Sequence, residues 1–239
     1  LVRLDEDRYR LIWTHHHILS DGWTDSRLMG EWLRCYAGEP MAAAPLPYGD
    51  YLRWLQAQDV GEAERFWKGE LACVDEPTLL ASAGDSDTGR AGFDKIYTRL
   101  DAAETARLQG FAQRERITLN TLVQAAWALL LHRHTGREQV VFGATVAGRP
   151  PSLFGAEEMM GLFINTMPVP VRPSVNLTVR DYLHVVQNTN LRLREHEHAA
   201  LADIQRWAGT AGRPLFDSII VFENVPVDKT LRSLERYGL

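Results

Sequence analysis

Residues 15–23 read His-His-His-Ile-Leu-Ser-Asp-Gly-Trp, and the interpretation of the whole chain starts from this stretch. It ends a run over residues 8–19 that is rich in aromatic and β-branched side chains, which predicts a buried strand. Side chains alternate between the two faces of a strand. His15 and His17 would therefore share one face, and His16 would point to the other.

A turn is expected directly after the histidines. Ser20 and Asp21 are good N-cap residues for a helix that begins near Gly22, and a glycine lets the backbone approach a ligand closely. A histidine at such a position has a pKa near neutrality, which suits proton transfer. Two plainer interpretations stay open: one histidine is an ordinary core residue, or His15, His17 and Asp21 bind a metal ion.

Composition narrows the class of protein. The chain has 239 residues, and 26 Lys and Arg against 31 Asp and Glu give a formal net charge of −5. This length and ordinary composition fit a globular α/β protein with an ample core, and the acidic balance argues against nucleic acid as the main partner. The longest apolar run, 125–131, is too short to span a membrane. Two isolated cysteines, Cys35 and Cys73, fit a reducing compartment rather than a disulfide scaffold.

Helices and strands are expected to alternate along the chain, which predicts a mixed α/β sandwich. The polar, Gly-rich residues 74–92 are the best candidate linker, and Asp101 with Glu104 matches a capping box. Pro168 and Pro170 indicate the margin of a sheet. Besides 8–19, strands are expected over 93–100, 139–147, 162–171 and 215–223, and helices over 22–38, 48–71, 101–115, 118–134, 179–197 and 204–207.

Motifs for covalent catalysis are missing from the sequence. It holds no Gly-x-Ser-x-Gly elbow, no P-loop and no dinucleotide-binding glycine pattern. An acyl-transfer reaction on this chain would therefore proceed by direct attack of a bound acceptor, without a covalent acyl-enzyme. The pairs His132/His134 and His196/His198 fall in expected helices, where residues two apart do not face each other, so we expect them at the surface.

Four segments together resemble one known family. Residues 16–22 are similar to the HHxxxDG signature of nonribosomal peptide synthetase condensation domains. Residues 48–54 resemble the YxDYxxW segment of that family, residues 148–172 its GRxxP…GxFxNTxPxR segment, and residues 213–224 its RxPLFDSxxxFEN segment. They occur in the order of the family over nearly the whole chain. Thr24 stands where serine is common in the family.

The resemblance implies a fold and its division. The family fold is an α/β, two-subdomain, chloramphenicol acetyltransferase-like sandwich with a V shape, and we expect it to be incomplete here, with the chain excised at both ends from something longer. Residues 1–75 would be the end of the N-terminal subdomain, 76–91 a linker, and 92–239 most of the C-terminal subdomain. The arginine that pairs with Asp21 would lie upstream of Leu1.

The resemblance also implies an activity. An upstream and a downstream peptidyl carrier protein would deliver thioesters on phosphopantetheine arms, next to an adenylation domain, and the acceptor amine would attack the donor thioester to form an amide in the cytoplasm. The domain itself would bind no cofactor or metal, and neither nucleic acid nor membrane would be a partner. The alternatives are a related HxxxD acyltransferase that uses a free amine, a free alcohol or coenzyme A, and a non-catalytic domain that recruits carriers.

Seven residues are the expected site. His17 would be the catalytic residue, as a base or by holding the amine. His16, Asp21 and Gly22 would support the loop, with Asp21 in a charge pair and the Gly22 N–H directed at the developing oxyanion. Trp23, Ser218 and Asn224 would line the substrate tunnel. Asn165 is expected to be structural, at the end of a strand.

Overall fold

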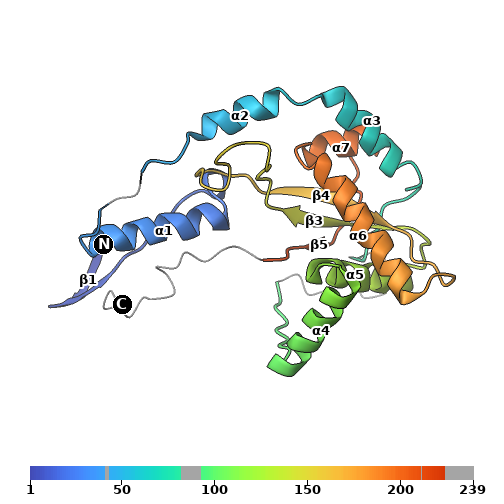
Figure 1. Cartoon of the computed structure of the whole chain (residues 1–239), viewed down its shortest axis with the longest axis horizontal. Helices are drawn as coiled ribbons and strands as arrows, with labels where there is room; N and C mark the ends of the chain where they lie inside the picture. Colours follow the sequence, from blue (N-terminus) through green and yellow to red (C-terminus); the bar gives the residue numbers. More distant parts are fainter. Residues whose placement is uncertain (41–42, 82–92, 211, 224–239) are drawn as a thin grey trace. The chain divides into compact units, whose positions relative to one another are not determined.

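A computed structural model describes residues 1–40, 43–81, 93–210 and 212–223 (Figure 1). The chain divides into two compact units. Unit 1 contains Leu1–Gln58 and Ala147–Ile164, and unit 2 contains Asp59–Val146 and Asn165–Phe222. Each unit is therefore assembled from segments that lie far apart in the sequence.

Unit 1 begins with a short hairpin of β1 (Val2–Asp5) and β2 (Arg8–Arg10), which pair antiparallel. The strand expected over 8–19 forms only as β2 and is not buried, because β2 ends at Arg10 and residues 8–19 are all exposed. A strand needs a partner for its backbone groups, and residues 11–16 pair with no strand in the described part of the chain. A single 3₁₀ turn, η1 (His17–Leu19), follows instead.

Three helices follow η1 in sequence. α1 (Gly22–Tyr36) begins at the expected N-cap, Asp21. The single helix expected over 48–71 is two helices, α2 (Tyr48–Gln56) and α3 (Val60–Glu70). The break has a local cause: the Asp59 side chain accepts a hydrogen bond from the Glu62 N–H and starts a new helix. α3 belongs to unit 2, where it packs on α7.

The sheet of unit 2 has the strand order β4-β3-β5. The central strand β3 (Val140–Val146) is antiparallel to β4 (Asn165–Val171) and parallel to β5 (Ile219–Ile220). The expected central strand over 139–147 is confirmed. β4, with its two prolines, lies at the edge of the described sheet, as proline requires.

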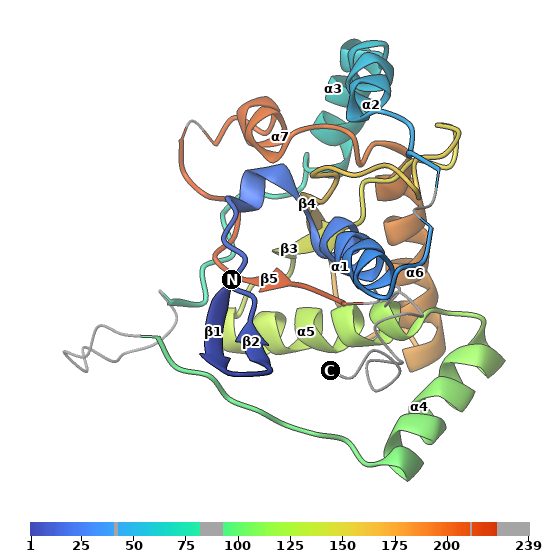
Figure 2. The ribbon, with the colours of Figure 1, turned by 90° about the vertical axis from the view of Figure 1, so that its left-hand side faces the viewer.

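The helices of unit 2 cover this sheet and one another (Figure 2). α5 (Leu119–Thr135) packs on β3 and α6, α6 (Val179–Glu195) on β4, and α7 (Leu201–Trp207) on β4, while α4 (Ala102–Glu115) packs on α5. Their starts follow the sequence, since Asp101 and Glu104 form the expected capping box and Thr118 and Thr178 cap α5 and α6. Trp67 and Phe142 are completely buried in the shared apolar core.

Two other strand predictions fail, one wholly and one in extent. Residues 93–100 form no strand, and Phe93, Ile96 and Tyr97 are strongly exposed. The last strand is confined to the two residues of β5 rather than 215–223. Both segments have β-forming side chains, but only Ile219–Ile220 finds a partner strand among the described residues.

The expected linker is only partly described, since residues 82–92 lie outside the described residues. Thr78 is completely buried, pairs with Phe216 and accepts a hydrogen bond from the Val141 N–H at 2.8 Å. Residues 76–81 thus belong to unit 2, where Thr78 is the buried residue of this range. The subdomain boundaries at 76–91 stay a prediction.

His134 is exposed as expected, but His196 and His198 are less exposed than expected. Helix α6 ends at Glu195, so residues 196–198 form a turn rather than a helix surface. The His196 ring stacks on Phe66 with 3.9 Å between ring centroids, and burial lowers the pKa of His198. Asn165 donates to the carbonyls of Glu197 and Ala199 at 2.8 and 2.7 Å, which confirms its structural role at the start of β4.

Candidate active site

The candidate catalytic histidine lies in η1. His17 Nδ1 is 3.0 Å from the carbonyl oxygen of Ser20. A carbonyl only accepts hydrogen bonds, so Nδ1 carries the hydrogen, and in the neutral ring Nε2 keeps its lone pair. Hydrogen bonding to its own backbone carbonyl and to that of Ser20 raises the pKa of His17, and the charges of Asp25 and Asp21 add to the rise.

His16 has a different part in the same turn. It is the N-cap of η1, and its Nδ1 accepts a hydrogen bond from the Ile18 N–H at 3.1 Å. The expected alternation of His16 and His17 along a strand is wrong, because the extended backbone ends at the N-cap His16 and the 3₁₀ turn begins at His17. Both side chains are exposed, so neither is a core histidine.

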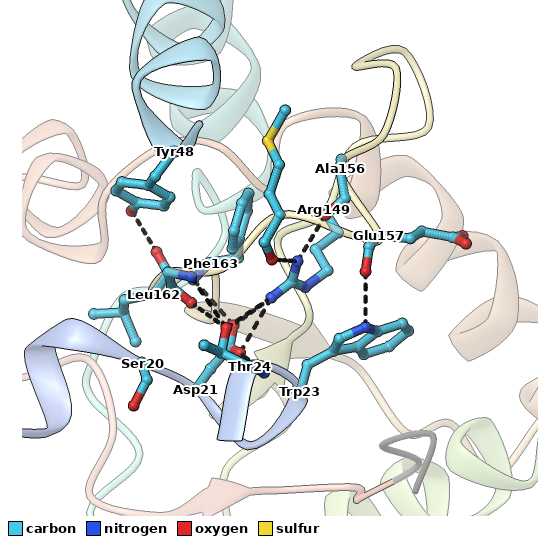
Figure 3. Close-up of polar contacts among 12 residues, drawn as sticks. Ser20, Asp21, Trp23, Thr24, Tyr48, Arg149, Ala156, Glu157, Leu162 and Phe163 are labelled. Atoms are coloured by element: carbon cyan, nitrogen blue, oxygen red, sulfur yellow. Dashed lines mark hydrogen bonds and ion pairs between the residues drawn. The ribbon is translucent and has the colours of Figure 1, made fainter. Parts of the chain in front are cut away.

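Asp21 is the buried centre of a hydrogen-bond network (Figure 3). Its side chain is 1% exposed. Oδ1 accepts from the Thr24 N–H at 2.9 Å, Oδ2 accepts from the Phe163 N–H at 3.1 Å, and Arg149 Nη2 lies 3.2 and 3.3 Å from the two oxygens. A carboxylate offers about four lone-pair directions. These contacts occupy them, so Asp21 braces its surroundings and has no free oxygen for another donor.

Arg149 holds the other end of this ion pair and is itself 3% exposed. Its Nη1 donates to the carbonyls of Ala156 and Met159 at 2.6 and 2.8 Å, and its Cζ lies 4.0 Å from the centroid of the Phe163 ring. Burial lowers the pKa of Arg149, while Asp21 acts in the opposite direction. The guanidinium therefore ties the loop over 149–163 to the start of α1.

Asp21 thus has its expected charge pair but not the expected partner. We expected an arginine upstream of Leu1, and that expectation is wrong, because Arg149 of the Gly148-Arg149-Pro150 segment fills this place. A buried carboxylate needs a cation, so an arginine partner for Asp21 could be expected. The two residues are 128 positions apart along the chain, and the spacing therefore did not point to Arg149.

Thr24 and Tyr48 hold the same loop through hydrogen bonds that the sequence analysis did not predict. The Thr24 hydroxyl donates to the Gly161 carbonyl at 2.8 Å and accepts from the Gly161 N–H at 3.1 Å. The Tyr48 hydroxyl donates to the Leu162 carbonyl at 2.5 Å. A serine could supply the same hydroxyl as Thr24, which explains why the exchange at this motif position leaves the network intact.

Two glycines of the same loop are required by close contacts. A Cβ on Gly148, which has φ +62°, would lie 1.8 Å from the carbonyl oxygen of Phe163. A Cβ on Gly161 would lie 2.2 Å from Cδ2 of the Tyr48 ring. Larger residues at either place would push the loop away from Asp21.

Trp23, Gly22 and Ser218 are described by the structure, and none of their predicted roles is tested by it. The Trp23 indole N–H donates to the Glu157 carbonyl at 3.0 Å, and Gly22 is the exposed first residue of α1. In unit 2, the Ser218 hydroxyl accepts from the Trp127 indole N–H at 3.3 Å. Asn224 lies outside the described residues. The tunnel roles of Trp23, Ser218 and Asn224 stay predictions.

A metal site is not formed by the described residues. No group of three or more His, Cys, Asp or Glu among them has a metal-binding arrangement, so the alternative with His15, His17 and Asp21 is wrong. Asp21 cannot serve as the third metal ligand, because its carboxylate faces Arg149 and backbone amides. Among the described helices, none has the length and apolar character that a membrane crossing needs.

Comparison with known proteins identifies the class. A family model described as "Condensation domain" matches residues 1–237, so the chain belongs to the condensation domain family. It is 43% identical over 242 residues to a linear gramicidin synthase of Brevibacillus parabrevis, and 41% identical over 245 residues to chondramide synthase of Chondromyces crocatus. These alignments cover 97% and 100% of this chain but only 3% and 6% of the relatives.

Solved structures show the same fold. The first condensation domain of the CDA synthetase matches with a TM-score of 0.66 at 23% identity, over 89% of this chain and 49% of that one. The X-domain from teicoplanin biosynthesis matches with a TM-score of 0.64 at 27% identity, over 85% of this chain and 49% of that one. The expected family and its fold class are thereby confirmed, and the chain spans about half the length of these structures.

Proposed function

We propose that the chain provides the catalytic histidine for amide-bond formation between two carrier-bound substrates. The main support is the geometry of His17: its Nδ1 donates a hydrogen bond to the Ser20 carbonyl, and the residue is exposed. Nε2 is thereby kept for an incoming group. Membership of the condensation domain family and the likeness to peptide synthetases support this activity.

The reaction needs no group beyond the two substrates. The amine of an aminoacyl thioester on the downstream carrier attacks the thioester carbonyl of the acyl or peptidyl donor on the upstream carrier. The C–N bond forms, the C–S bond breaks, and the proton lost by the amine ends on the phosphopantetheine thiol of the donor. His17 Nε2 accepts the hydrogen of the amine, either by removing the proton or by holding the amine for attack.

The surroundings of His17 suit this role. Asp21 is saturated by Arg149 and two amides, so it fixes the loop rather than accepting protons. Gly22 opens α1, and the first N–H groups of a helix lack intrahelical acceptors, which makes the Gly22 N–H our candidate donor to the oxyanion. The partners are the two carriers and an adjacent adenylation domain, and we place the reaction in the cytoplasm.

A two-carrier assay tests the proposal. The full natural polypeptide is mixed with loaded donor and acceptor carriers, and the acceptor carrier is followed by intact-protein mass spectrometry. We expect a mass gain that falls about 10²- to 10⁴-fold with His17→Ala, the range for loss of a proton-transfer group. His134→Ala, which removes an exposed histidine of α5, is the matched control and should leave the rate unchanged.

Other outcomes point to the alternatives. Transfer to a free amine or alcohol without the acceptor carrier would establish the free-substrate acyltransferase. Unchanged product with His17→Ala would leave carrier recruitment as the role. The pH dependence separates the two actions of His17, because an α-amine with pKa of about 7.7–8.0 is mostly neutral above pH 8. A defect that shrinks there indicates proton removal, and a constant defect indicates positioning.

A further inference from the structure

His15 is held in place although it stands before the histidine pair of the motif. Its Nδ1 is 3.4 Å from the Ser20 hydroxyl, and its Nε2 is 3.7 Å from Oδ2 of Asp25. Its ring also meets Trp13 edge-on, with 5.6 Å between the centroids. These contacts on both ring nitrogens and with the Trp13 ring restrict the orientation of the imidazole, although the residue is exposed.

Asp25 has an electrostatic reason to attract this ring. Its Oδ1 is buried and finds no hydrogen-bond partner among the described residues, while Oδ2 faces His15. A shielded carboxylate oxygen without a donor favours a nearby cation. The His15 ring is the neighbour of Asp25 on this side, and its other nitrogen faces the Ser20 hydroxyl.

Ser20 joins this pair to the candidate catalytic ring. It is 6% exposed, its hydroxyl contacts His15, and its carbonyl accepts the His17 Nδ1–H at 3.0 Å. His15 thus contacts the side chain of the residue whose carbonyl accepts the His17 Nδ1–H. The charged groups that face His17 are Asp25 on α1 and Asp21 at its N-cap.

We propose that His15 and Asp25 are positioning residues that hold Ser20 and thereby keep the His17 ring with Nδ1 protonated and Nε2 free. The catalytic consequence rests on the proposed function, but the effect on the His17 ring does not. Neither residue needs to touch a substrate. The pair acts on the reaction only through the orientation and protonation of His17.

The first measurement is ¹⁵N NMR of the imidazole of His17 in the full natural polypeptide. The variants are His15→Gln and Asp25→Asn, and Glu31→Gln is the matched control because it neutralises the other acidic residue of α1, which pairs with Arg27. We expect both pair variants to reduce the Nδ1–H tautomer of neutral His17. Asp25→Asn should also lower the pKa of His17, because the carboxylate charge raises it.

The second measurement is the rate of the two-carrier reaction. We expect either variant to lower kcat about tenfold with unchanged KM for both carriers, since a displaced reacting group costs rate rather than binding. The double variant should be no slower than the worse single variant, because the two residues act as one unit. Asp25→Glu, which keeps the carboxylate, should be faster than Asp25→Asn. Melting temperatures show that each variant is folded.

The outcomes separate the two proposals. An unchanged His17 tautomer and pKa in folded His15→Gln and Asp25→Asn would overturn the positioning role, whatever the rates. Additive rate losses would also overturn it. An altered His17 signal in a protein that makes no amide from any carrier pair would support the positioning pair and contradict the proposed function.

Discussion

Asp21→Asn is the substitution that tests the architecture of the site most directly. Asparagine keeps one oxygen for the Thr24 N–H but places an NH₂ group where the second oxygen stood. That NH₂ would face two donors, the Phe163 N–H and Arg149 Nη2. The variant therefore loses the charge, loses at least one hydrogen bond and leaves a buried guanidinium without its anion.

The magnitude follows from the burial of the pair. Both side chains are almost completely buried, at 1% and 3% exposure, so water cannot replace the lost partner. Removing one member of a buried ion pair costs about 3–5 kcal/mol. One decade in an equilibrium constant is about 1.4 kcal/mol, so the local opening of this network should become about 10²- to 10⁴-fold more frequent.

Native-state hydrogen exchange measures this opening at the atoms concerned. Peptides that contain the Thr24 and Phe163 amides should lose about two to four decades of protection in Asp21→Asn, while a peptide from α6 serves as an internal control. Arg149→Gln should give a similar loss. The double variant Asp21→Asn/Arg149→Gln should cost about 2 kcal/mol less than the sum, because neither charge is then left alone. Additive losses, or a loss below tenfold, would refute the network as described.

Three further predictions concern single contacts. Gly148→Ala should lower the free energy of unfolding by about 2 kcal/mol or more, because its Cβ would lie 1.8 Å from the Phe163 carbonyl oxygen. Gly136→Ala has φ +69° and nothing within 4 Å, so it should cost only the left-handed strain, about 1 kcal/mol. Equal losses in thermal unfolding would contradict the clash. Burial raises the pKa of Tyr182 to about 12, so we expect its phenolate absorbance to appear near pH 12 in the folded protein. The stability that the neutral phenol contributes is complete below pH 10 and should be lost as the pH rises through 12. A titration of Tyr182 at pH 10 would contradict its burial. Asn165→Ala should cost about 1–3 kcal/mol in urea unfolding, since it removes the donors to the Glu197 and Ala199 carbonyls, while Asn188→Ala on the exposed face of α6 should be neutral.

Local signals in the sequence predicted local structure well. The caps at Asp21 and Asp101 were predictable because each acts on an amide three residues away. The break between α2 and α3 had the same kind of signal, Asp59 followed by Glu62, but the apolar pattern across residues 48–71 masked it. Helix boundaries therefore depended on noticing caps rather than on periodicity.

Non-local structure was predicted less well, and for a physical reason. Residues 93–100 have the composition of a strand, yet a strand also needs a partner, and composition does not specify one. The same holds for residues 11–16, where the expected buried strand is an exposed segment leading into η1. Only motif order, which carries information from the whole family, connected segments as distant as His17 and residues 148–163.

Asp21 holds the loop and His17 is the candidate reacting group, so a loss of activity has to be interpreted differently for variants of each residue. Asp21 cannot accept a proton for His17, because its oxygens are occupied by Arg149, Thr24 and Phe163. The tautomer of His17 is set instead by a backbone carbonyl, which has no titration of its own. An Asp21 variant should therefore lose activity in proportion to the opening of the loop, without a shift of the pH profile as large as Asp25→Asn produces. Under the proposed function, the same signature motif contains one residue that holds the backbone, Asp21, and one that takes part in the reaction, His17.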